Sequence, residues 1–121
     1  MSLHLELGAA IEASFADDLA SPVEQKQDAL IIRLKNGVTL DVRYAAADAY
    51  SLRWAYGDAE SGIDTAPLHR GLATFPNHFH HAGGPIVADP VTRPDALPAD
   101  NLQRLIRALL DDPMLGAKGV S

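Results

Sequence analysis

Apolar residues recur every four positions at the start of the chain, and this spacing predicts an N-terminal helix. The stripe consists of Leu3, Leu7, Ile11, Phe15 and Leu19. Side chains four residues apart share one face of a helix, so we expect this face to be buried. Ser21-Pro22 should end the helix, because proline cannot continue its hydrogen-bond ladder.

Two segments with apolar residues at every second position follow the helix and predict a β-hairpin. They span 30–34 and 38–43 and flank a connection at 35–37. A two-residue turn would place the apolar residues of the two strands on opposite faces of the sheet. A three-residue loop places all of them on one face, as a half-buried sheet requires. We therefore expect Gly37 to adopt a left-handed conformation at a bulge.

Further strand signals follow the hairpin. Residues 49–56 alternate in the same way and predict a third strand, and residues 57–62 resemble a turn. A short fourth strand is expected to start at Ile63. Residues 85–98 contain several prolines, which favour an extended segment.

Helical spacing returns near the C-terminus. The apolar residues there are Leu102, Leu105, Ile106, Leu109 and Leu110. Asp100 is a suitable N-cap, and Asp111-Asp112-Pro113 should end the helix. The predicted fold class is α+β, with an N-terminal helix, an antiparallel β-meander of three to four strands, a histidine-rich loop and a C-terminal amphipathic helix.

Composition narrows the classes of function. The chain has 121 residues, no cysteine and a formal net charge of −6. This length fits one domain, 1–121, in which we expect the tail from Met114 to Ser121 to be frayed. The absence of cysteine excludes disulfides and thiolate metal ligands and is typical of cytoplasmic proteins. No apolar run reaches the roughly 18 residues that a membrane span needs, so no membrane association is expected.

Four of the five histidines lie close together, at His69, His78, His80 and His81. In an extended chain the side chains of His78 and His80 point to the same face. Together with His69 and Asp64, they could bind a divalent ion such as Zn, Ni, Mn or Fe, because imidazole and carboxylate suit these metals.

The same residues could act as acids and bases without a metal. RNA cleavage through the 2′-hydroxyl needs a base, an acid and a cation that stabilises the charged transition state. His69 with His78 or His80 could supply the base and the acid. Arg53 or Arg70 could be the cation, and Asp64 could orient an imidazole. A purely structural role of the histidines is the third interpretation.

The segment that contains these histidines matches a family signature over about seventeen positions. The shared residues are Asp64, Ala66, Pro67, His69, Thr74, Phe75, Pro76, His78 and His80. Their spacing, without a gap, resembles that of the TumE family, small proteins described as toxin components of bacterial and archaeal toxin–antitoxin pairs. The chain departs from the family pattern at Thr65, Leu68, Asn77 and Phe79.

The resemblance implies a small toxin with RNA as a candidate substrate and a helix-turn-helix antitoxin as a partner. It carries over Asp64, His69, His78 and His80 as site residues. Two other classes of function stay open: a metal-binding module or metal-dependent hydrolase, and a non-catalytic interaction domain whose partner covers the open face of the sheet or the region of Trp54. A homodimer formed through an unpaired sheet edge is also consistent with the sequence.

Overall fold

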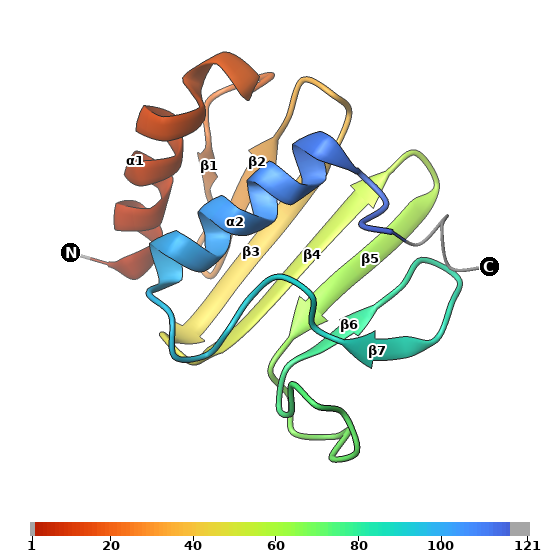
Figure 1. The fold of residues 1–121 in the computed structure, drawn as a ribbon. Helices are drawn as coiled ribbons and strands as arrows, with labels where there is room; N and C mark the ends of the chain where they lie inside the picture. Colours follow the sequence, from red (N-terminus) through yellow and green to blue (C-terminus); the bar gives the residue numbers. More distant parts are fainter. Residues whose placement is uncertain (1, 117–121) are drawn as a thin grey trace.

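A meandering antiparallel sheet forms the centre of the computed structural model, which describes residues 2–116 (Figure 1). The helical segments are α1 (Leu3–Phe15), the short 3₁₀ helix η1 (Ala16–Asp18) and α2 (Pro98–Asp111). The strands are β1 (Glu24–Gln25), β2 (Leu30–Arg33), β3 (Thr39–Ala46), β4 (Ala49–Tyr56), β5 (Ala59–Asp64), β6 (His78–His80) and β7 (Ile86–Ala88). Each strand pairs with the next, so the order in the sheet equals the order in the chain.

The α+β class and both terminal helices agree with the sequence prediction, but the expected three to four strands are too few. Seven strands are found within residues 2–116. Only Gly57 and Asp58 separate β4 from β5, because Gly57 adopts a φ of +59° and allows a tight turn. Most of the segment that we expected to be a turn is therefore strand. The histidine-rich segment is also only partly a loop, since His78 and His80 lie on β6.

The predicted hairpin between β2 and β3 is confirmed. Ile32 pairs with Leu40, and the Leu34 amide donates to the Val38 carbonyl, as the three-residue loop requires. Gly37 has a φ of +101°, the left-handed conformation expected at this position.

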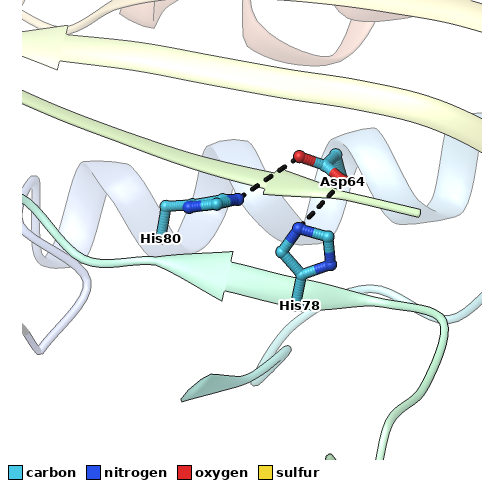
Figure 2. Close-up of side chains that lie close together, drawn as sticks. All are labelled: Asp64, His78 and His80. Atoms are coloured by element: carbon cyan, nitrogen blue, oxygen red, sulfur yellow. Dashed lines mark ion pairs between the residues drawn. The ribbon is translucent and has the colours of Figure 1, made fainter. Parts of the chain in front are cut away.

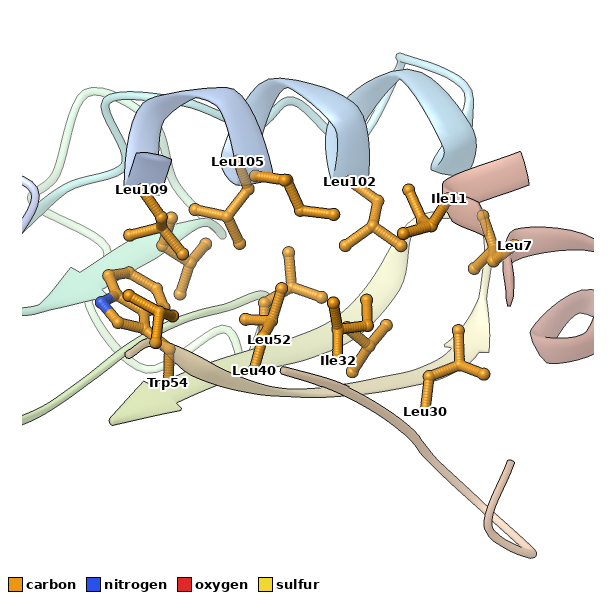
Figure 3. Packing of buried hydrophobic residues seen from close by; sticks show 14 of the residues in the cluster. Leu7, Ile11, Leu30, Ile32, Leu40, Leu52, Trp54, Leu102, Leu105 and Leu109 are labelled. Carbon is orange, nitrogen blue, oxygen red and sulfur yellow. The ribbon is translucent and has the colours of Figure 1, made fainter. Parts of the chain in front are cut away.

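Both helices pack on the same face of the sheet (Figure 1). Figure 3 shows Leu105 and Leu109 of α2 above the buried side chains of β3 and β4. Trp54 is among these side chains and is only 3% exposed, so it belongs to the core rather than to a docking surface. We call this side of the sheet the inner face and the opposite side the outer face.

The ends of the helices differ slightly from the prediction. The helix α1 ends at Phe15, and Leu19 instead forms a β-bridge with Leu34. The helix α2 begins with Pro98, whose fixed φ suits the first helical position, so Asp100 lies in the first turn and is not the N-cap.

The outer face is not covered by a helix (Figure 1). Arg33, Asp41, Arg43 and Arg53 lie there, as the alternation predicts. Arg43 is bound to Asp41, with 3.1 Å between Nε and Oδ1. This face is therefore the open surface on which a site could be built.

The chain after α2 turns back onto the core. The Trp54 indole donates to the Pro113 carbonyl, and Asp112 accepts bonds from the amides of Met114 and Gly116. The tail that we expected to be frayed continues into residues 117–121, which lie outside the described residues. Within residues 2–116, neither helix is long and apolar enough to cross a membrane.

Candidate active site

The candidate site begins with a cross-strand pair on the outer face. Asp64 is the last residue of β5 and pairs with His78, the first residue of β6. His80, two positions further along β6, points to the same side because side chains alternate along a strand (Figure 2). We call Asp64, His78 and His80 the histidine–aspartate cluster.

The Asp64 carboxylate connects the two imidazoles (Figure 2). Its Oδ1 atom lies 3.0 Å from His78 Nε2, and its Oδ2 atom lies 3.5 Å from His80 Nε2. The Ala66 amide donates to Oδ1 at 2.9 Å and helps to hold the carboxylate in place. A single carboxylate therefore fixes the orientation of both rings.

His78 is enclosed, with its side chain only 1% exposed. Its Nδ1 atom lies 3.2 Å from the Pro76 carbonyl oxygen, and its Nε2 atom faces Asp64. Both nitrogens therefore face oxygen atoms that only accept hydrogen bonds. This arrangement positions the ring and leaves it little contact with a large substrate.

His80 is the accessible member of the cluster, with 44% of its side chain exposed. Partial burial is the main cause that lowers the pKa of His80 below its ordinary value, and the neighbouring His78 lowers it further. Asp64 opposes that shift. A lowered pKa favours the neutral ring, which can accept a proton.

The loop between β5 and β6 brings His69 to the same place. Its ring centroid lies 4.7 Å from that of His78 and 6.4 Å from that of His80. The ring-to-ring contacts thus bring together all three histidines that the sequence singled out. His81 points to the inner side and contacts Phe79, with 4.3 Å between ring centroids.

The two candidate arginines lie in different surroundings. Arg53 lines an open depression of about 210 Å³ together with Asp64, His80 and Gly62. Gly62 is paired with Arg53 on one side and with His80 on the other, and the Arg53 side chain lies over it, with its Cγ atom 3.3 Å from the position that a Cβ of residue 62 would take. Arg70 instead lies over the Phe75 ring, 5.7 Å from the ring centroid.

A buried polar network that the sequence analysis missed supports β6 from the inner side. The Asn77 amide donates to Tyr50 Oη at 2.9 Å and to Asp89 Oδ2 at 3.0 Å. Asp89 Oδ1 accepts from the amides of Val91 and Thr92. The sequence Asp-Pro-Val-Thr could have indicated this Asx-type turn, because a short acidic side chain often bonds to the backbone just after it.

The departures from the family pattern lie away from the histidine–aspartate cluster. Asn77 and Phe79 alternate with the cluster histidines and face the inner side, where Phe79 stacks on Trp54. Thr65 bonds to the Tyr50 amide, and Leu68 is 74% exposed in the loop. None of these four side chains takes the place of a member of the cluster.

Comparison with known protein families agrees with the resemblance in the histidine segment and extends it. A family model described as Toxin TumE matches residues 6–112, which is most of the chain. Searches of curated proteins and of solved structures gave no significant match.

Proposed function

The chain belongs to the TumE toxin family and is thus a toxin-like component of a toxin–antitoxin system, and we propose that it acts by cleaving RNA at the histidine–aspartate cluster. The observation that carries this proposal is the pair of imidazoles held by one carboxylate beside Arg53, on the face of the sheet that no helix covers. An open face suits a polymeric substrate, which could not enter an enclosed cavity.

The accessible rings perform the proton transfers in the proposed reaction. His80 accepts the proton of the 2′-hydroxyl group, and the 2′-oxygen forms a bond to phosphorus. The bond from phosphorus to the 5′-oxygen breaks, and His69 gives its proton to that oxygen. The products are a 2′,3′-cyclic phosphate and a 5′-hydroxyl end, so no water or cofactor is consumed. General acid–base catalysis of this kind contributes about 10²–10⁴-fold.

Asp64 and His78 act as positioning residues. The carboxylate contacts both rings of the cluster, and His78 is too enclosed to contact the RNA. Arg53 supplies the positive charge, since it lines the same depression as His80 and forms no ion pair within the described part of the chain. A cation aimed at the developing phosphorane charge lowers the barrier to cleavage.

The test uses purified, chelator-treated protein and a single-stranded RNA labelled at its 5′ end. The wild type should produce fragments that end in a cyclic phosphate. His80→Ala should cleave at least about a hundredfold more slowly. His81→Ala is the matched control, because His81 is in the same segment but faces Phe79. Intact RNA with the wild type, or equal rates for the two variants, would contradict the proposal.

Membership of a toxin family also suggests an antitoxin partner. That this partner is a helix-turn-helix protein, and that the chain forms a homodimer, stay predictions.

A further inference from the structure

The hydrogen bonding of His78 points to a cation at the cluster. A neutral imidazole carries one N–H, yet both ring nitrogens of His78 face an acceptor: the Pro76 carbonyl at Nδ1 and the Asp64 carboxylate at Nε2. When Nδ1–H donates to Pro76, the Nε2 lone pair faces a carboxylate oxygen 3.0 Å away. A proton or a metal ion between the two atoms removes this conflict.

The spacing of the donor atoms fits a metal ion. One ligand atom from each of Asp64, His78 and His80 can be chosen so that all lie within 4.8 Å of one another. The two contacts to Asp64 involve different carboxylate oxygens, with 3.0 Å from Oδ1 to His78 Nε2 and 3.5 Å from Oδ2 to His80 Nε2. Two donors bound to one tetrahedral Zn²⁺ at about 2.0–2.2 Å are about 3.3–3.6 Å apart. Side-chain rotations that shorten the longest separation among the carboxylate oxygen and the two ring nitrogens would therefore bring these three atoms around one ion.

The surroundings of the ligands are those that metal sites require. A metal-binding histidine usually donates its other N–H to a carbonyl or carboxylate, which fixes the ring, and Pro76 does this for His78. The Ala66 amide fixes the Asp64 carboxylate in the same way. Two histidines and one carboxylate leave a fourth position free for water, as in three-ligand zinc sites.

We propose that the histidine–aspartate cluster binds one divalent transition-metal ion, and that this ion inhibits the RNA cleavage proposed above. A metal on His80 Nε2 occupies that lone pair, and a metal on Asp64 displaces the carboxylate from its contacts with both rings. While the ion is bound, His80 therefore cannot accept the proton of the 2′-hydroxyl group. Only this inhibitory part rests on the proposed function.

Binding is tested first, with Zn²⁺ as the probe and without any activity assay. Chelator-treated full-length protein is dialysed against ZnCl₂, and the bound zinc is measured by elemental analysis. The wild type and His81→Ala should each bind one equivalent. His80→Ala and Asp64→Asn should bind far more weakly, because loss of even a second-shell partner costs about 10–100-fold in affinity. The His80 side chain is 44% exposed, so His80→Ala should fold, and circular dichroism checks this.

Inhibition is tested next, by RNA cleavage with chelator and then with one equivalent of Zn²⁺. We expect cleavage with chelator and at least a tenfold loss with zinc, which excess chelator reverses. No zinc bound to the wild type, zinc retained equally by all variants, or faster cleavage with zinc would each overturn the inference. Zinc binding without cleavage under either condition would instead overturn the proposed function and leave the metal site standing.

Discussion

Asp64 and His78 pair across two neighbouring strands, and their side chains also meet, with 3.0 Å between Oδ1 and Nε2. Asp64 is therefore the neighbour of His78 both in the backbone pairing of the two strands and in the contact between side chains. The pairing of β5 with β6 places His78 opposite Asp64, and the contact with the carboxylate then orients its ring. Because the backbone pairing does not need the carboxylate, a substitution of Asp64 should lower the catalytic rate more than it lowers stability.

Asp64→Asn should lower the rate of RNA cleavage by about a hundredfold or more. The amide keeps the shape of the carboxylate but removes the negative charge that lies beside both imidazoles. Single-turnover rates with chelator present measure the effect. Asp41→Asn is the matched control, since Asp41 lies on the same face and binds Arg43. Equal losses in the two variants would point to a general effect of charge on RNA binding.

Arg53→Gln should reduce cleavage by about 10²–10³-fold, as does the loss of a group that stabilises transition-state charge. Arg43→Gln removes the same charge from the same face and should reduce cleavage far less, because Asp41 already neutralises Arg43. The two rates are compared at saturating RNA, so that weaker binding does not mask the difference. Similar rates for the two variants would exclude a catalytic role for Arg53.

Asn77→Ala should lower the free energy of unfolding by about 1–3 kcal/mol, because it removes hydrogen bonds between buried polar groups. Asn77 is fully buried and donates to Tyr50 and Asp89. Urea unfolding measures the change. Leu68→Ala, in the same connection between β5 and β6 but 74% exposed, should change stability by less than about 0.5 kcal/mol. An unchanged midpoint for Asn77→Ala would show that the network contributes little.

The protein should lose stability as the pH rises above about 10, where tyrosines of the unfolded chain ionise. Burial raises the pKa values of both Tyr44 and Tyr50 in the folded state. The folded protein thus holds these protons longer than the unfolded chain, and the stability that depends on them is lost with increasing pH.

Tyr44→Phe tests the origin of this alkaline loss. The Tyr44 hydroxyl is buried and has no hydrogen-bond partner within residues 2–116, so its removal should not destabilise the protein at pH 8. The variant should also lose less stability than the wild type between pH 8 and pH 11, as measured by urea unfolding. An identical pH dependence in the two proteins would assign the loss to other groups.

The sequence predicted best where periodicity and turn chemistry determine the structure. The register of β2 and β3 followed from keeping apolar residues on one face, and the conformation of Gly37 followed from that register. The strand β6 was missed because its outward residues are histidines next to a proline, which resembles a loop. Its pairing with β5 depends on contacts between residues that are far apart in the sequence, and the local periodicity of a segment contains no information about such contacts.

The candidate site was predictable in its residue types but not in its arrangement. The HxH spacing and a nearby aspartate indicated Asp64, His78 and His80, and the structure brings them together. The choice between Arg53 and Arg70 needed the fold, since Arg70 is nearer in sequence but lies over Phe75. The network of Asn77 was also hidden, because its partners come from separate turns and strands.

Side chains alternate between the two faces of the sheet from Asn77, just before β6, to His80 at its end. Asn77 and Phe79 face the packed inner side, whereas His78 and His80 face the outer side, where His78 is enclosed and His80 is accessible. Substitutions in this short segment should therefore inactivate the protein in two different ways. Substitutions that face the inner side should lower stability, whereas His80→Ala should give a folded but inactive protein. The folded, inactive variant would be useful in the laboratory, as a bait with which to isolate the antitoxin.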